Sequence, residues 1–117
     1  MTGKLTTHVL DTALGVPAEG IVVTLDRFGG KTRERVASAT TNADGRLDTP
    51  LMEGAGFYTG EYEIVFRAGQ YLRSVGHELP DPAFLDDIPI RFGIADETHY
   101  HVPLLLSPYG YSTYRGS

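Results

Sequence analysis

The chain has 117 residues and an acidic balance, with 10 Lys and Arg against 15 Asp and Glu and a formal net charge of −5. This balance favours solubility and argues against nucleic-acid binding, which relies on clustered basic side chains. The absence of cysteine excludes disulfides and thiolate metal sites, and the length predicts one domain over residues 1–117.

The first half of the chain alternates apolar and polar residues and predicts three strands. A short strand is expected over 5–11, Gly and Pro break the pattern at 13–20, and the clearest strand covers 20–29. Two glycines at 29–30 indicate a turn, after which 32–42 returns as the second strand of a hairpin. The cluster Lys-Thr-Arg-Glu-Arg inside this hairpin is expected to be a solvated face.

The second half of the chain predicts one helix among further strands. The helix is expected over 67–76, where Tyr71, Leu72 and Val75 form an apolar face. Strands are expected over 60–68, 88–95, 99–107 and within 111–116. About seven or eight short strands with one helix predict an all-β fold, an antiparallel sandwich.

Three of the four histidines lie in predicted strands. His99 and His101 are separated by one residue, so both side chains point to the same face of their strand. His8 lies in the first strand and is a weak signal by itself. His77 follows the end of the predicted helix and is expected to be an ordinary surface residue.

The strand over 99–107 has one apolar face that is expected to contribute to the core. That face consists of Val102, Leu104 and Leu106. The opposite row contains His101, Pro103 and Leu105, which is unusual for a solvated face and typical of one that packs against another subunit. Tyr109 and Tyr111 are expected to be packing or interface aromatics.

Metal chemistry is one alternative for the histidines. A His-x-His pair with a third His can bind zinc, but no Cys or acidic residue is placed to complete such a site. We therefore expect no metal and no cofactor. If the protein is an enzyme, its functional side chains are His, Arg and Tyr acting on a small polar molecule and water.

Two features of the sequence bear on location. No stretch reaches the ~18 consecutive apolar residues of a membrane span. The beginning "MTGKLTTHVLDT" lacks the apolar segment of a signal peptide, and the last residues are not a peroxisomal address. These observations predict a cytoplasmic protein without a membrane partner.

Three motifs resemble the transthyretin-like family, and within it the branch that hydrolyses 5-hydroxyisourate in urate degradation. They are "LTTHVLDTALGVPAEGI", "NADGRL" and "HYHVPLLLSPYGYSTYRGS", in family order over essentially the whole chain. The resemblance implies a transthyretin-like sandwich of two four-stranded sheets with one short helix. It also implies a homotetramer, a dimer of dimers crossed by a channel, and an activity that needs no cofactor.

The resemblance assigns residues to an active site at each end of that channel. His8, Arg46 and His101 are expected to be catalytic, and the expected substrate-binding residues are His8, Arg46, Tyr114, Arg115 and Ser117. Which histidine is the general base stays open. The alternatives are a carrier that binds a hydrophobic ligand in the channel, as transthyretin does, and a metal-dependent amidohydrolase that chelation would inactivate.

Overall fold

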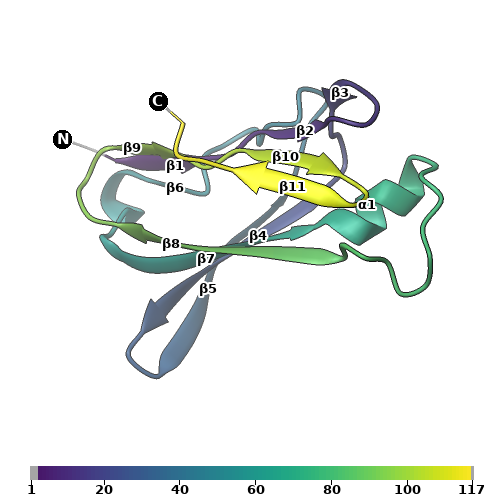
Figure 1. Cartoon of the computed structure of the whole chain (residues 1–117). Coiled ribbons are helices and arrows are strands. Elements are labelled where there is room, and N and C mark those ends of the chain that lie inside the picture. The colour runs from purple at the N-terminus through teal and green to yellow at the C-terminus, as the bar shows by residue number, and fades with distance from the viewer. Residues whose placement is uncertain (1–2, 117) are drawn as a thin grey trace.

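The computed structural model describes residues 3–116, which form two layers of β-structure with one short helix at one end (Figure 1). The elements in chain order are β1 (Lys4–Thr6), β2 (Val9–Asp11), β3 (Val16–Pro17), β4 (Val22–Gly29), β5 (Thr32–Thr40), β6 (Met52–Glu53), the 3-10 turn η1 (Gly54–Gly56), β7 (Gly60–Arg67), α1 (Ala68–Ser74), β8 (Asp87–Ile94), β9 (His99–His101), β10 (Leu104–Ser107) and β11 (Gly110–Thr113). Among these residues, no helix is long and apolar enough to cross a membrane.

The predicted all-β sandwich with one helix is confirmed, but its division into sheets differs from the prediction. One layer is a four-stranded antiparallel sheet in the order β5-β4-β7-β8. The other layer consists of two sheets, β6-β1-β9 at one end and β11-β10-β2-β3 at the other (Figure 1). Two strand pairs in this layer, β1 with β9 and β2 with β10, are parallel.

The second layer is divided because two predicted continuous strands, 5–11 and 99–107, are each interrupted at the same level. The register continues across the gap, since Thr6 pairs with His101 and Val9 with Leu104. Within the gap, the buried hydroxyl of Thr7 donates to the carbonyl oxygen of Val102 at 2.7 Å. Pro103 has no N–H with which to continue the ladder. This interruption lies beside His8 and His101.

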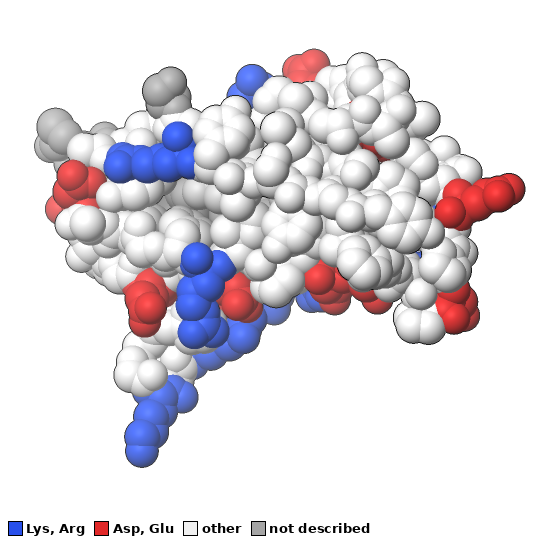
Figure 2. Space-filling view, viewed as in Figure 1, with Lys and Arg blue, Asp and Glu red and all other residues white. Residues whose placement is uncertain are grey.

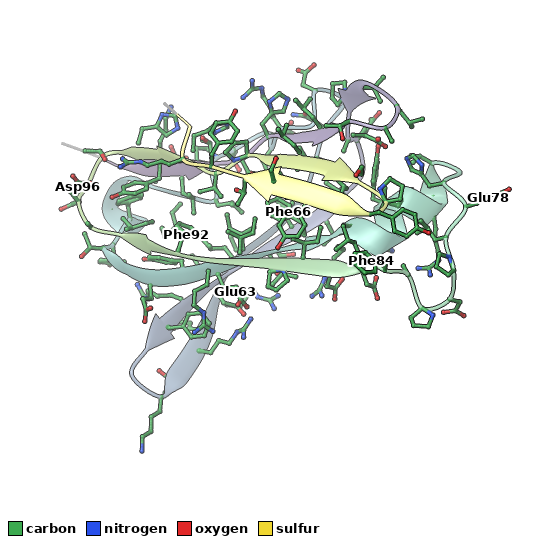
Figure 3. The ribbon with its side chains drawn as sticks, viewed as in Figure 1. Glu63, Phe66, Glu78, Phe84, Phe92 and Asp96 are labelled. Atoms are coloured by element: carbon green, nitrogen blue, oxygen red, sulfur yellow. The ribbon has the colours of Figure 1, made fainter. Side chains whose placement is uncertain are left out.

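The core fills the space between the layers, as Figure 3 shows for Phe66. Val102, Leu104 and Leu106 are buried, as expected for the apolar face of their strand. The helix buries Tyr71 and Leu72, but Val75 is 40% exposed, contrary to the prediction. The reason is that α1 ends at Ser74 and Val75 already has non-helical backbone angles.

The β4–β5 hairpin projects away from the other layer and carries the basic cluster (Figures 1 and 2). Residues 31–35 are exposed, which confirms the predicted solvated face. The hairpin is held by ion pairs of Arg33 and Arg35 with the buried carboxylate of Asp26, and Arg33 also pairs with Glu63.

The expectation that His77 is an ordinary surface residue is wrong. Its side chain is 12% exposed, and its Nε2 lies 3.0 Å from Oδ2 of the fully buried Asp11. The hydroxyl of Tyr71 donates to the same oxygen at 3.0 Å. Burial opposes the ionisation of Asp11, but the hydrogen bonds from His77, Leu14 and Tyr71 outweigh it and hold the pKa of Asp11 below its usual value of 3.8. The cluster joins β2 to the helix.

Replacing Asp11 with alanine is expected to lower the free energy of unfolding by about 3 kcal/mol, because Tyr71 and two backbone N–H groups lose a buried acceptor. The contribution of Asp11 is present above pH 3.8 and is lost as the pH falls through its lower folded pKa. Urea unfolding at several pH values measures it. Asp87→Ala, which removes an exposed ion pair, is the control and is expected to change stability by less than ~1 kcal/mol. Equal effects of the two substitutions would contradict the assignment.

Candidate active site

An open cavity of about 380 Å³ lies beside the interruption in the second layer. It is lined by Lys4, Thr6, Thr7, Arg46, Leu47, Thr49, His99 and His101. These residues come from β1 and the residue that follows it, from β9, and from the segment after the Asn42–Gly45 turn. The cavity therefore brings together two of the three expected catalytic residues, Arg46 and His101, from opposite halves of the chain.

A tight turn determines where Arg46 lies. The side-chain oxygen of Asn42 accepts from the backbone N–H of Asp44 at 2.9 Å and of Arg46 at 3.2 Å. Gly45 has a φ of +74°, and a Cβ there would lie 2.3 Å from the carbonyl oxygen of Val9. Only glycine therefore fits this turn so close to β2, and the turn presents the exposed Arg46 side chain to the cavity.

His8 lies next to this turn but is not among the described residues that line the cavity. It forms an isolated antiparallel bridge with Arg46. Its Nε2–H donates to the carbonyl oxygen of Asp44 at 2.8 Å, and among residues 3–116 no group is hydrogen bonded to its Nδ1. His8 is thus held beside Arg46, with one ring nitrogen occupied by the turn.

His101 is half-buried and held on two sides. Its Nδ1 lies 2.8 Å from the hydroxyl oxygen of Thr6, and its carbonyl oxygen accepts from the backbone N–H of Gly116 at 2.8 Å. Burial lowers the pKa of His101, and the positive charge of Arg46 lowers it further, followed by His99 and His8. The ring is therefore held toward its neutral form, which can accept a proton.

Gly116 explains part of the conspicuous "YRGS" ending. A Cβ at this position would lie 2.6 Å from Cδ2 and 3.2 Å from Cγ of the His101 ring. The backbone of the tail thus packs directly against the imidazole, and a glycine is required because of this close approach rather than because of its backbone angles.

Tyr114 and Arg115 line a second pocket, of about 140 Å³, together with Phe92, Gly93, Tyr100, Val102 and Thr113. The Arg115 guanidinium lies 4.0 Å from the centre of the Tyr100 ring, a cation–π contact. Within this chain the two side chains therefore lie apart from the 380 Å³ cavity. Ser117, the last expected substrate-binding residue, lies outside the described residues.

Five further polar residues at the cavity were not among the expected site residues: Lys4, Thr6, Thr7, Thr49 and His99. The spacing of His99 and His101 already placed both on one face of a strand. What the sequence pattern could not show is the parallel pairing of β1 with β9, which brings Lys4 opposite His99 and Thr6 opposite His101. Within residues 3–116, no group of three or more His, Cys, Asp or Glu side chains is close enough to hold a metal ion.

Comparison with known proteins shows the family of the chain. The sequence matches the HIUase/Transthyretin family over residues 5–116. The chain belongs to this family. The resemblance seen in the three motifs is thereby confirmed.

Members of the family with different functions resemble this chain to different degrees. 5-Hydroxyisourate hydrolase 2 from Rhizobium meliloti (strain 1021) is 67% identical over 117 residues, which cover 99% of this chain and 98% of the relative. The crystal structure of (S)-allantoin synthase matches with a TM-score of 0.94 and 47% identity over 99% of this chain, which spans only 44% of that longer chain. Sea bream transthyretin, solved in complex with thyroxine, matches with a TM-score of 0.86 but 26% identity, over 97% of this chain and 94% of that chain.

Proposed function

We propose that this chain is an enzyme of urate degradation that hydrolyses 5-hydroxyisourate to 2-oxo-4-hydroxy-4-carboxy-5-ureidoimidazoline. The observation that carries the proposal is the pairing of a half-buried histidine of lowered pKa, His101, with Arg46 in one open cavity. The 67% identity to a relative named for this activity supports it. The fold alone does not, because transthyretin shares the fold.

The reaction requires activated water, stabilisation of an oxyanion and a proton for the leaving nitrogen. We assign the general base to His101 rather than His8, because His101 lines the cavity and His8 Nε2–H is bonded to the Asp44 carbonyl. His101 takes the proton of the attacking water and returns it to the nitrogen of the opened C–N bond. Arg46 offers its planar set of donors to the ring carbonyl oxygens, where negative charge develops.

The remaining assignments concern the tail and the assembly. His8 orients the substrate beside Arg46, and Tyr114, Arg115 and Ser117 contribute to substrate binding. One domain spans 1–117 and assembles as a cytoplasmic homotetramer. Exposed aromatic side chains support an assembly, since Tyr109 is 64% and Tyr111 45% exposed in the single chain.

The direct test generates 5-hydroxyisourate in situ from urate with urate oxidase and follows its ultraviolet absorbance. Micromolar protein is expected to accelerate the decay well above the spontaneous rate, with or without a chelator. Decay at the spontaneous rate would reject the hydrolase. Tight binding of a hydrophobic ligand such as thyroxine, together with inactivity, would instead support a carrier.

The pH dependence of kcat/KM tests the role of His101. Because the pKa of His101 is lowered from its usual 6.5 by burial and by Arg46, its neutral form persists at pH 6.5. Activity is therefore expected to be retained there and to fall only at lower pH, as the ring becomes protonated. Initial rates measured between about pH 5 and about pH 8 give the midpoint. A midpoint above 6.5 would contradict the assignment.

A further inference from the structure

The hydroxyl of Thr6 lies between two imidazole rings. Its oxygen is 2.8 Å from Nε2 of His99 and 2.8 Å from Nδ1 of His101. The ring centres are 6.3 Å apart, with an angle of 62° between their planes. The parallel register of β1 and β9 produces this arrangement, because it sets Thr6 opposite His101 on the face that also carries His99.

The chemistry of a hydroxyl couples the two rings. A threonine hydroxyl has one proton to donate, so it donates to one imidazole and accepts from the N–H of the other. If Nδ1 of His101 carries a proton, the hydroxyl accepts it and donates to Nε2 of His99. If Nδ1 is unprotonated, both bonds reverse. The protonation of one ring therefore fixes that of the other.

The remaining nitrogen of His101 is the one available for chemistry. Thr6 occupies Nδ1, and Gly116 packs against the Cδ2 edge of the ring. Among residues 3–116, no protein group is hydrogen bonded to Nε2, and the side chain lines the cavity. A base that uses Nε2 must carry its resting proton on Nδ1, which is the arrangement in which Thr6 donates to His99.

We propose that Thr6 and His99 form a proton relay behind His101, in which Thr6 is a positioning residue and His99 holds the transferred proton at the cavity rim. This inference rests on the proposed function and deepens it. His99 is suited to the role because it is exposed, whereas His101 is half-buried near the positive charge of Arg46 and close to His8. Lys4, which is paired with His99 in the β1–β9 register, also lines the cavity and carries a positive charge.

The relay conserves protons at each step. An O–H bond of the attacking water breaks as an N–H bond forms at His101 Nε2. The N–H bond at His101 Nδ1 then breaks and its proton joins the Thr6 oxygen, whose own proton passes to Nε2 of His99. His101 now carries a single proton on Nε2, and His99 carries the additional proton. As the C–N bond breaks, reverse transfer from His99 through Thr6 returns a proton to Nδ1 of His101 while the Nε2 proton passes to the leaving nitrogen, which restores the resting state.

Three Thr variants test the relay with wild-type enzyme measured in parallel. Thr6→Val keeps the shape of the side chain but removes the hydroxyl. We expect kcat to fall by ~10-fold or more, up to the roughly 10²-fold effect of losing assisted proton transfer. We expect KM to stay within about 2-fold of the wild-type value. Thr6→Ser is expected to recover most of kcat. Thr32→Val removes an equivalent hydroxyl bond, to the Gly29 carbonyl at 2.7 Å in the distant hairpin, and is expected to match wild type.

His99→Ala provides an independent test, because the side chain is exposed and its removal is expected to leave the fold intact. Its kcat is expected to fall about 10-fold and to recover when free imidazole is added, since a small base can enter the vacated position. A purely structural role would not respond to imidazole. Wild-type kcat in both Thr6→Val and His99→Ala, with an active wild-type enzyme, would overturn the relay alone. An inactive wild-type enzyme would instead overturn the proposed function.

Discussion

Replacing Arg46 with alanine is expected to lower kcat/KM by roughly 10²–10³-fold, the range seen when one donor to a developing oxyanion is removed. The melting temperature is expected to stay close to that of the wild type. Activity and melting temperature are expected to respond differently because the backbone of Arg46, not its side chain, makes the hydrogen bonds that stabilise the turn. Its N–H donates to Asn42 and its carbonyl accepts from the Asn42 N–H at 2.7 Å, and alanine keeps both bonds.

The pH profile of this variant carries a second expected change. The guanidinium of Arg46 opposes protonation of His101, so its loss lets the pKa of His101 rise. The acidic limb of kcat/KM should therefore move to higher pH in Arg46→Ala. Arg46→Lys is the matched control, because it keeps the positive charge but loses the planar donor pair.

Initial rates across the pH range, with a thermal melt of each variant, distinguish these effects. In Arg46→Lys the acidic limb of kcat/KM is expected to stay at the wild-type pH, while turnover is expected to be well below that of the wild type. Near wild-type turnover in Arg46→Ala would remove Arg46 from the mechanism. A lowered melting temperature that accounts for the lost activity would assign it a structural role instead.

The sequence pattern was a good guide to the strands because their core faces follow a period of two. Ile21, Val23 and Leu25 are all fully buried, as the alternation in 20–29 requires. The interruption of the long strands was not predictable in the same way. It depends on Thr7 bonding across to Val102, a contact between segments 95 residues apart that no local pattern encodes.

The candidate site was predictable only in part, because it also depends on contacts between distant segments of the chain. The motif "NADGRL" placed Arg46 among the expected site residues, but only the structure shows how closely Gly45 approaches Val9. His77 was misjudged because its partner, Asp11, lies 66 residues earlier, and burial of a histidine depends on such a partner. Likewise Thr6 carried no signal until the parallel pairing set it between His99 and His101.

Removing the last four residues, by truncation after Thr113, is expected to leave a folded protein with turnover lowered by about 10²-fold or more. The fold should survive because the β10–β11 ladder ends at the pair Leu104–Thr113 and needs nothing beyond it. Turnover should fall for two reasons. The truncation removes the Gly116 N–H that donates to the His101 carbonyl, and it removes the backbone that packs against the His101 ring. Circular dichroism, the oligomeric mass and the hydroxyisourate assay measure the two effects separately.

A single methyl group tests the same idea without shortening the chain. In Gly116→Ala the new Cβ would meet Cδ2 of His101 at 2.6 Å, so either the ring or the tail must move. We expect a clear loss of kcat, since a base displaced from its bonding geometry transfers protons poorly. Gly110→Ala is the matched control, because its Cβ would meet only the Ser107 hydroxyl at 3.7 Å, an ordinary contact. The contrary result would be Gly116→Ala with the activity of Gly110→Ala, while truncation still abolishes turnover. The tail would then act through Tyr114, Arg115 or Ser117, and not through the packing of Gly116 against His101.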